Sequence, residues 1–335
     1  MNLTLLTRDE VRLEIAATAG QSALEAAEAA GLYPAAMCRD GQCGQCAAHV
    51  VSGTYEMGPH SPAALPPEPG GVLLCRCVPT SDLTVVLPYG DTQLPRHSVP
   101  VRQAVIETLH PAGTAAMSLV LRLQPDAALG QTADFLPGQY MELRPPGMAI
   151  SRAYSLANLP NWDGTLEFLI RLVPDGAFSG WLAQVAKPGD MLELRGPLGQ
   201  FTLDEASLRA RWLVGGGCGF APLLSLLRQM AEFQDTTPVR LIYGVNVAEE
   251  LLPNDIFAPL QEALPQLQIT FAVWRGAPGA NAVQGSTAEI LENLLASTET
   301  PPDIYVCGPP KMVETVLDAA RRAGVPETQL FCEKL

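Results

Sequence analysis

The sequence predicts a multidomain protein: a small domain that mixes strands with one helix, an antiparallel β-barrel, and an α/β domain with a parallel sheet. Three observations support this prediction. A hairpin pattern and one helix precede a cysteine-rich loop, a middle stretch contains many short strand patterns, and the last stretch alternates strands with helices. With 335 residues the chain is long enough for two or three domains. We expect them at residues 1–93, 98–205 and 208–335.

Composition limits the kind of protein this can be. Apolar residues make up 47% of the chain, which is ample for packed cores. The net charge of −14 argues against a nucleic-acid partner. No apolar run approaches the roughly 18 residues that span a bilayer, and no signal peptide is recognised. We therefore expect a cytoplasmic protein without a membrane span, and we expect it to be monomeric.

The first block has the element order of a β-grasp domain. Alternating apolar residues predict a β-hairpin near the N-terminus. Ser22 and Glu25 form a capping box that opens an Ala-rich helix, which should end near Gly31. A cysteine loop follows at once. Residues 88–100 contain Gly90 and two prolines without an apolar period, and they are typical of an interdomain linker.

The spacing of four cysteines indicates a [2Fe–2S] cluster. They follow the plant-type pattern C-x4-C-x2-C with a distant fourth ligand, and are Cys38, Cys43, Cys46 and Cys75. Gly41 and Gly44 lie inside the loop and let its backbone approach the inorganic sulfurs. Cys77 is a rival fourth ligand, although the apolar run before Cys75 favours Cys75.

A zinc site and a disulfide framework are the two other interpretations of these cysteines. Zinc usually takes two short Cys pairs or a Cys pair with a His pair, and no second pair of either kind follows the loop. Disulfides are typical of secreted chains, and no signal peptide is recognised. We therefore prefer the cluster.

The second block is rich in strands and turn signals. Pro137-Gly138 and Pro188-Gly189 punctuate it, and no long helix pattern intervenes, which predicts an antiparallel barrel. The expected strands are Val101–Ile106, Met117–Leu123, Gln139–Leu143, Leu166–Leu172 and Met191–Leu194.

The third block alternates strands and helices, which predicts a parallel sheet that binds ligands at the carboxyl ends of its strands. The expected strands are Arg211–Val214, Val239–Tyr243, Ile269–Trp274 and Ile304–Cys307. The expected helices are Leu223–Glu232, Thr287–Leu295 and Lys311–Ala323.

Two motifs in these blocks indicate nucleotide binding. The run from Gly215 to Pro222 follows a strand and opens a helix, so its N–H groups suit a pyrophosphate. Arg152-Ala153-Tyr154-Ser155 offers a phosphate partner, a ring that packs beside a flavin, and a hydroxyl near the flavin N5. The later turn Asp175–Ser179 offers N–H groups and a hydroxyl to a diphosphate. Their occurrence in this order predicts a flavin domain before a nicotinamide domain.

With these motifs in place, the chain resembles the ferredoxin–NADP reductase superfamily over essentially its whole length. It is most similar to the oxygenase-reductase branch, and within it to the reductase components of soluble methane monooxygenase and related di-iron monooxygenases. The supporting stretches are Leu73–Arg76, Ser81–Leu83, Leu87–Tyr89, Asn158–Asn161, Leu166–Arg171, Tyr243–Asn246 and Pro302–Pro310.

The resemblance implies a set of functional residues. It implies that FAD is bound by Arg152, Tyr154, Ser155, Ile170, Arg171, Gly176 and Ser179. It implies that the dinucleotide is approached by Gly216, Gly217, Cys218 and Gly219, with Cys307, Gly308 and Pro309 beside the nicotinamide. Catalytic roles then fall to Ser155, Cys307 and Glu333, the last as a candidate near the flavin or nicotinamide. The alternative for Cys307 is an ordinary buried core cysteine.

Two departures from the family stand out. Cys218 occupies a position where family members usually have Thr, which puts a hydroxyl contact to the dinucleotide in doubt. The C-terminus ends in Leu335, where the family normally has an aromatic residue followed by further chain, and this affects access of the nicotinamide.

Acidic residues near the second strand of the last block predict the choice of nicotinamide. A 2′-phosphate needs cationic groups, whereas a 2′-hydroxyl suits a carboxylate. Glu249 and Glu250 follow the run Tyr243–Asn246, and no Lys or Arg follows that strand there. We therefore expect NADH.

These inferences combine into one functional hypothesis. Electrons pass from NADH to FAD, then to the [2Fe–2S] cluster, and then to the hydroxylase of a di-iron monooxygenase. A reductase for a Rieske dioxygenase or a cytochrome P450 is one alternative, and a non-catalytic redox module is another. The oxygenase is not expected in this chain: its one Glu-x-x-His string, Glu107–His110, lies on a predicted strand rather than a helix.

Overall fold

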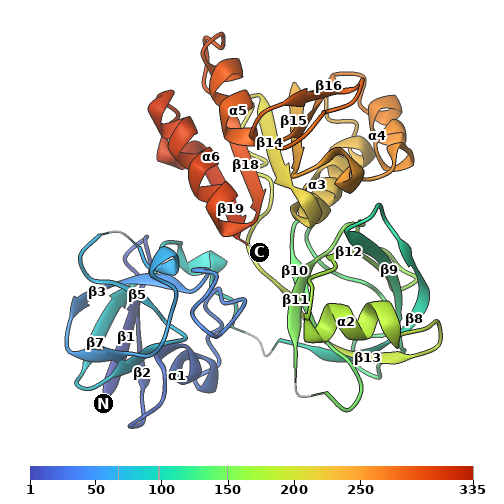
Figure 1. Cartoon of the computed structure of the whole chain (residues 1–335). Coiled ribbons are helices and arrows are strands. Elements are labelled where there is room, and N and C mark those ends of the chain that lie inside the picture. Colours follow the sequence, from blue (N-terminus) through green and yellow to red (C-terminus); the bar gives the residue numbers. More distant parts are fainter. Residues whose placement is uncertain (67, 97–98, 149, 335) are drawn as a thin grey trace. The chain divides into compact units, whose positions relative to one another are not determined.

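The computed structural model describes residues 1–66, 68–96, 99–148 and 150–334 (Figure 1). The chain divides into two compact units, one formed by Met1–Pro100 with Leu198–Gln200 and the other by Val101–Pro197 with the residues from Phe201 onward. Leu335, at which the family departure was noted, lies outside the described residues. No described helix is long and apolar enough to cross a membrane.

The first unit is built on a five-stranded sheet in the order β2-β1-β7-β3-β5, with a separate two-stranded ribbon of β4 and β6. β1 pairs antiparallel with β2, which confirms the predicted hairpin, and parallel with β7. The strands are β1 (Asn2–Leu6), β2 (Arg12–Ala16), β3 (Ala47–Ser52), β4 (Tyr55–Met57), β5 (Gly71–Leu73), β6 (Cys77–Pro79) and β7 (Leu83–Val86).

Helix α1 (Ala23–Ala29) delivers the chain to the cysteine loop. The predicted capping box is present: the Ser22 hydroxyl accepts from the N–H of Glu25 at 3.2 Å, and the Glu25 carboxylate accepts from the N–H of Ser22 at 2.9 Å. Small apolar residues of α1 pack into the same core as Leu3 and Leu5. The short side chains let the helix lie close to the sheet, which fixes where the loop begins.

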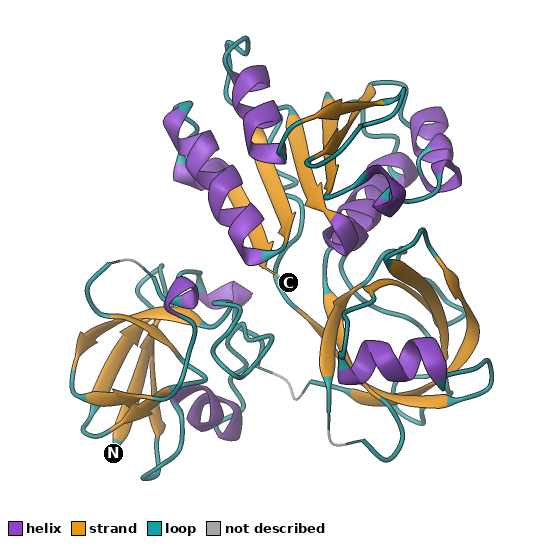
Figure 2. Cartoon of the chain, viewed as in Figure 1, coloured by secondary structure: helices purple, strands orange, loops and turns teal. Residues whose placement is uncertain are grey.

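The second unit begins with a six-stranded antiparallel barrel in the order β11-β10-β13-β8-β9-β12 (Figure 2). A bridge between Leu156 and Phe168 joins the two end strands. The strands are β8 (Val101–Pro111), β9 (Ala116–Leu123), β10 (Tyr140–Arg144), β11 (Arg152–Ser155), β12 (Thr165–Arg171) and β13 (Met191–Leu198). Helix α2 (Ala177–Gln184) was expected only as a turn; Phe178 and Leu182, four residues apart, pack its inner face into the barrel core.

The rest of the second unit is a parallel six-stranded sheet in the order β17-β16-β15-β14-β18-β19, with helices on both faces (Figures 1 and 2). Its strands are β14 (Arg211–Gly216), β15 (Val239–Val245), β16 (Leu267–Val273), β17 (Ala282–Gln284), β18 (Asp303–Gly308) and β19 (Leu330–Lys334). Its helices are α3 (Phe220–Glu232), α4 (Ala258–Ala263), α5 (Thr287–Leu295) and α6 (Pro310–Arg322). The predicted fold class of all three blocks is confirmed.

The barrel and the parallel sheet share a core, so the seam between them is a packed interface. Apolar residues of the barrel, such as Leu169, belong to the same buried cluster as those of α3. Polar contacts tie α3 to the barrel as well: Ser225 Oγ donates to the carbonyl of Asn158 at 2.6 Å, and Arg228 Nη1 meets Glu167 Oε2 at 2.7 Å. The seam therefore holds side chains from both parts in fixed positions.

The last strand, β19, was not predicted. Its segment is short and alternates too weakly to indicate a strand alone, and pairing with β18 makes it one. In this register Cys307 lies opposite Glu333.

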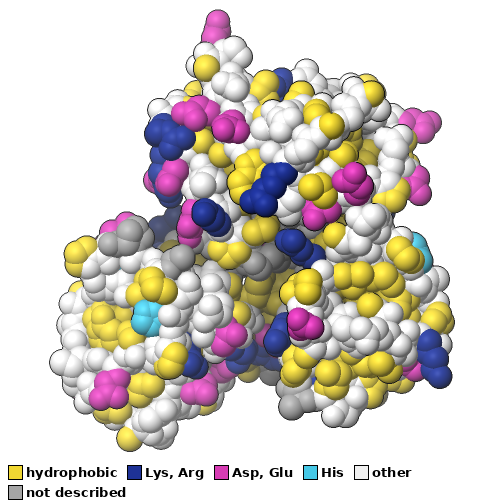
Figure 3. Space-filling view, viewed as in Figure 1, with side chains coloured by type: hydrophobic (Ala, Val, Ile, Leu, Met, Phe, Trp, Pro, Cys, Tyr) yellow, Lys and Arg dark blue, Asp and Glu magenta, His cyan; other side chains and the backbone are white. Residues whose placement is uncertain are grey.

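Figure 3 shows acidic and basic side chains interspersed over the visible face of this sheet domain, so that face has no basic surface suited to nucleic acid.

Candidate functional site

The cysteine loop turns its backbone N–H groups toward its own thiols. Cys38 Sγ accepts from the N–H groups of Gln42 and Cys43, each at 3.3 Å, and Cys43 Sγ accepts from the N–H of Gln45 at 3.5 Å. The adjacent thiol of Cys43 holds the pKa of Cys38 down to about 6. Such N–H contacts stabilise thiolates, which are the form that binds metal.

The four predicted ligands form two pairs of thiols. Cys38 lies against Cys43, and the sulfur of Cys46 lies 3.2 Å from that of Cys75. Among the described residues, no three His, Cys, Asp or Glu side chains converge where a single metal ion could bind. A [2Fe–2S] cluster needs two thiolates on each iron, so this pairing fits a cluster better than a mononuclear zinc site.

Cys77, the rival ligand, takes a different environment. It lies in β6 and is fully buried, whereas Cys75 lies in the turn between β5 and β6. Burial raises the pKa of its thiol to about 12, which keeps it protonated. The structure therefore brings Cys75, and not Cys77, to the other three cysteines.

A second loop, residues 58–61, closes over the cysteine loop. Arg76 Nε donates to the carbonyl of Pro59 at 2.8 Å, and the N–H of Ser61 donates to the carbonyl of Gly41 at 3.0 Å. Gly41 has φ of +82°, and a Cβ there would come within 2.8 Å of His60 Cβ. Only glycine fits this position, which agrees with the close backbone approach predicted from the sequence.

The predicted flavin motif lies on β11, at one end strand of the barrel. The Tyr154 ring packs against Phe178 with centroids 4.9 Å apart, and burial raises the pKa of its hydroxyl. Arg152 is exposed and donates to the carbonyl of Ser151 at 2.8 Å. Ile170 is buried in the barrel core, so only its backbone is available to a ligand.

The turn before α2 uses its hydroxyl internally. Ser179 Oγ accepts from the N–H of Val173 at 3.2 Å and donates to the carbonyl of the same residue at 3.1 Å. From the sequence this hydroxyl was expected to reach a diphosphate. In the structure the hydroxyl bonds within the loop and holds its conformation. Gly176 is the N-cap of α2. The N–H groups of the first turn of α2 are therefore the groups that this segment can offer to an anion.

Three strands bring the predicted catalytic residues together. Ser155 Oγ of β11 donates to Glu333 Oε2 of β19 at 3.0 Å, and Cys307 of β18 is the register partner of Glu333. Glu333 and Cys307 are fully buried. Burial raises the pKa of Glu333 to about 7, and burial also raises the pKa of Cys307 well above its usual value. Glu333 Oε1 has no partner among the described residues.

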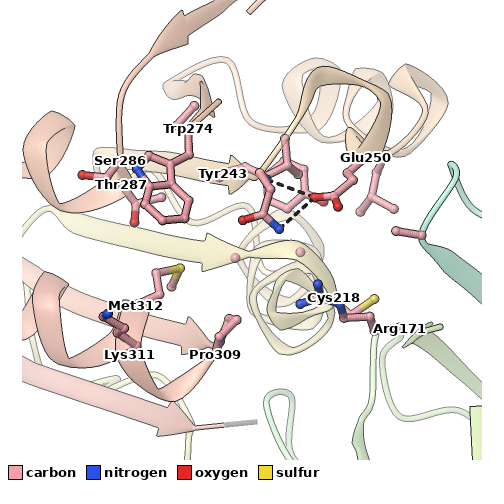
Figure 4. A pocket seen from close by; sticks show the side chains of 18 of the residues that line it. Arg171, Cys218, Tyr243, Glu250, Trp274, Ser286, Thr287, Pro309, Lys311 and Met312 are labelled. Atoms are coloured by element: carbon pink, nitrogen blue, oxygen red, sulfur yellow. Dashed lines mark hydrogen bonds between the residues drawn. The ribbon is translucent and has the colours of Figure 1, made fainter. Parts of the chain in front are cut away.

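A pocket of about 420 Å³ lies at the carboxyl ends of the parallel strands (Figure 4). Of the predicted dinucleotide residues, Gly216, Gly217, Cys218 and Pro309 line it. Gly219, Cys307 and Gly308 do not. Arg171, predicted to bind FAD, also lines the pocket from the barrel side.

Glycines shape this pocket by letting neighbours approach. A Cβ on Gly216 would clash with the sulfur of Met312, and one on Gly244 would clash with the Thr287 side chain. Gly219 packs against the backbone of Cys307 instead of lining the pocket, and a Cβ there would clash with the Cys307 carbonyl. The glycine run thus serves close packing as well as ligand approach.

Sequence reasoning missed much of the lining. The additional residues include Tyr243, Asn246, Trp274, Ser286, Thr287, Lys311 and Met312. They lie near the carboxyl ends of the parallel strands or in the segments that follow them, and that placement is the signal that could have found them. Of the two predicted acidic residues, Glu250 lines the pocket and Glu249 is exposed outside it. Glu250 Oε2 accepts from the backbone N–H of Asn246 at 3.0 Å and from Asn246 Nδ2 at 3.2 Å.

Comparison with known families matches three domains in the expected order. Residues 6–80 match the 2Fe-2S iron-sulfur cluster binding domain, residues 113–203 the oxidoreductase FAD-binding domain, and residues 213–318 the oxidoreductase NAD-binding domain. The predicted cofactor set is therefore confirmed at the level of domains.

Several known proteins align with most of this chain. The chain is 36% identical to methane monooxygenase component C of Methylosinus trichosporium, over 89% of this chain and 84% of that protein. It is 33% identical to the propane 2-monooxygenase reductase component of Mycolicibacterium goodii (96% and 94% covered). It is 34% identical to the toluate 1,2-dioxygenase electron transfer component of Pseudomonas putida (97% and 96% covered). Among solved structures, the Amycolatopsis cytochrome P450 reductase GcoB aligns with a TM-score of 0.74 at 28% identity, covering 99% of this chain and 98% of that one.

Serine substitutions at Cys75 and Cys77 test which thiol is the fourth ligand. We expect Cys75→Ser to lose the visible absorbance of the cluster, because one iron then lacks a thiolate. Cys77→Ser should keep the absorbance and lose about 1–3 kcal/mol of stability, because a hydroxyl is buried without a partner. A Cys77→Ser protein without a cluster, beside a Cys75→Ser protein that retains one, would reverse the assignment.

The raised pKa of Glu333 predicts a pH-dependent stability. The folded protein holds this proton more tightly than the unfolded chain, so the stabilisation is complete below the ordinary pKa of 4.5 and is lost as pH rises through about 7. Relative to wild type, Glu333→Gln should therefore gain about 2 kcal/mol between about pH 5.5 and about pH 8.5, measured by thermal unfolding. Glu262→Gln, on the exposed surface of α4, is the control. A constant offset between wild type and Glu333→Gln would contradict the prediction.

Proposed function

Because the chain belongs to the oxygenase-reductase branch of the ferredoxin–NADP reductase family, and is an iron–sulfur flavoprotein reductase, we propose that it carries electrons from NADH to the hydroxylase of a di-iron monooxygenase. The observation that carries this proposal is the presence on one chain of a paired-thiol loop and a dinucleotide pocket. FAD supplies the exchange between a two-electron donor and one-electron carriers, and the [2Fe–2S] cluster supplies the one-electron carrier.

We assign the binding of each group to particular residues. Cys38 and Cys43 would hold one iron, and Cys46 and Cys75 the other. FAD would be held by the β11 motif (Arg152, Tyr154, Ser155), the backbone at Ile170 and the first turn of α2, where Gly176 is the N-cap and Ser179 offers its backbone N–H. The dinucleotide would be held by the turn Gly216–Gly219 and the segment Cys307–Pro309. Arg171 lines the dinucleotide pocket, so we propose that its cation serves the NADH phosphates in addition to FAD.

Ser155, Cys307 and Glu333 would be the residues at the reacting rings. Glu333 Oε2 accepts the Ser155 hydroxyl, which leaves Oε1 as the atom that can carry a proton. Because burial keeps this carboxyl neutral up to about pH 7, it can hold a proton where water has no access. The neutral thiol of Cys307 packs beside it and excludes solvent.

Glu250 supports NADH as the donor. Its carboxylate is fixed by Asn246 at the end of β15, where a carboxylate suits a ribose 2′-hydroxyl and repels a 2′-phosphate. We expect kcat/KM for NADH to exceed that for NADPH by about tenfold or more. This ratio corresponds to the free energy of one charge-assisted hydrogen bond, which NADPH would lose. Glu250→Gln should narrow the ratio, whereas Glu249→Gln, outside the pocket, should leave it unchanged. A wild-type preference for NADPH would contradict the assignment.

The acceptor is proposed from the relatives, and a second candidate has support. Methane and propane monooxygenase reductases favour a di-iron hydroxylase, while the toluate dioxygenase component, similar over 97% of this chain, favours a dioxygenase as the alternative. A cytochrome P450 is the third option, given the similarity to GcoB.

Reconstitution decides between these acceptors. The purified reductase and NADH would be combined with a di-iron hydroxylase, a Rieske dioxygenase or a P450, and product formed per NADH oxidised would be measured. We expect tight coupling only with the di-iron hydroxylase. Cytochrome c reduction by NADH serves as the control for an active reductase. Coupling with the dioxygenase alone would replace the proposed partner.

We also propose that the protein acts as a cytoplasmic monomer. The thiols proposed to hold the cluster must stay reduced to bind iron, which suits a reducing compartment. The net charge of −14 opposes self-association.

A further inference from the structure

Trp274 presents an aromatic ring to the dinucleotide pocket. It follows the end of β16, lines the pocket and is 52% exposed. Tyr243 also lines the pocket, but it is fully buried and its ring packs against that of Phe257. Of these two aromatic residues, Trp274 is therefore the one whose ring offers open surface to a ligand.

Neighbouring groups hold this ring in place. The N–H of Trp274 donates to the carbonyl of Val245 at 3.0 Å, so the backbone here stays paired with the end of β15. The N–H of Arg275 donates in the same way to the carbonyl of Asn246 at 2.8 Å. The guanidinium carbon of Arg275 lies 4.3 Å from the centroid of the indole, which is a cation–π contact. Arg275 does not line the pocket, so it covers a part of the ring that does not border the pocket. A flat ligand can therefore stack on the ring from the pocket side.

The place of Trp274 in the sheet decides which half of a dinucleotide would reach it. The sheet order is β17-β16-β15-β14-β18-β19, and Cys307 and Glu333, which we place at the reacting rings, lie on β18 and β19. Trp274 follows β16, three strands from β18, which at about 4.8 Å per strand is roughly 14 Å. One ring of a dinucleotide cannot occupy both places. With the nicotinamide near Cys307, the adenine half extends toward Trp274.

The polar group nearest to Trp274 along the pocket wall is already used by the fold. Figure 4 shows Ser286 on the same side of the pocket as Trp274, and the N–H of Gly285 donates to the carbonyl of Val273 at 3.0 Å. The Ser286 hydroxyl caps α5: it accepts from the N–H of Glu289 at 3.2 Å and donates to the Glu289 carboxylate at 2.9 Å. This hydroxyl is not free for a sugar or a phosphate, so the ring itself is what this part of the pocket offers, and it suits a flat base.

We propose that Trp274 is a dinucleotide-binding residue whose indole stacks on the adenine ring of bound NADH. This inference rests on the proposed function, which assigns the pocket to NADH and places the nicotinamide beside Cys307. An aromatic side chain stabilises a base by stacking without any hydrogen bond to the base edges. Because Arg275 already holds the indole, the ring loses little freedom when the base arrives. The contact adds to affinity for the dinucleotide and takes no part in hydride transfer.

Trp274→Ala and Trp274→Phe test the proposal in the full chain with its cofactors bound. For each protein, kcat/KM would be measured with NADH and with reduced nicotinamide mononucleotide, which lacks the adenosine half. We expect Trp274→Ala to lower kcat/KM for NADH about five- to fiftyfold because KM rises, as for the loss of one stacked base. With the mononucleotide, the value should stay within about twofold of wild type, since no adenine is present to lose its contact. Trp274→Phe keeps a ring and should lose less than about threefold with NADH.

Trp162→Ala is the matched control, since Trp162 is 89% exposed, lies between β11 and β12 and does not line the pocket. It should leave kcat/KM unchanged with both donors. The Tm of Trp274→Ala should match that of wild type, because the side chain is half exposed. The proposal is overturned if Trp274→Ala uses NADH as wild type does, or if its kcat/KM falls by the same factor with both donors. A wild-type protein that oxidises neither donor would overturn the proposed function itself.

Discussion

The hydrogen bond between Ser155 and Glu333 is the contact on which the electron-input half of the molecule depends. It joins the last residue of a barrel strand to a residue near the end of the chain, 178 positions away. A buried carboxyl is costly, and this one is tolerated because Ser155 satisfies one oxygen and burial keeps the group neutral up to about pH 7. The bond exists only when β11 and β19 have both formed and the seam between barrel and sheet has closed.

The rest of the seam explains why that geometry is stable. Barrel residues and α3 share one apolar core, and Arg228 and Ser225 add polar contacts to the barrel backbone and to Glu167. Isolated exposed ion pairs contribute little, so the apolar burial provides the main stabilisation and the polar contacts fix the orientation. Arg171 of the barrel and the glycine turn after β14 both line the pocket. The packed seam therefore also keeps the pocket in shape. A pre-formed pocket of this kind loses little entropy when it binds a nucleotide.

The iron–sulfur half follows a different constraint. There the backbone passes within hydrogen-bond range of the Cys38 and Cys43 sulfurs, so short-range features dominate. They are two glycines with positive φ, the 58–61 loop and the N–H groups that face these thiols. Cys77 shows how finely position matters. Cys75 lies in the turn between β5 and β6, whereas Cys77, two residues later, begins β6, is fully buried and stays a neutral thiol.

The sequence alone determined the order of domains, the cluster ligands as a pattern, the flavin motif and most of the long strands and helices. These features are local, because spacing, alternation and capping are written within a few residues. Only the tertiary structure decided that Ser179 fixes its own loop, that Glu250 rather than Glu249 lines the pocket, and that Cys307 lies against Glu333. It also made a strand of Leu330–Lys334. Each of these depends on which distant strand becomes a neighbour, and strand pairing between remote segments has no signature in either segment by itself.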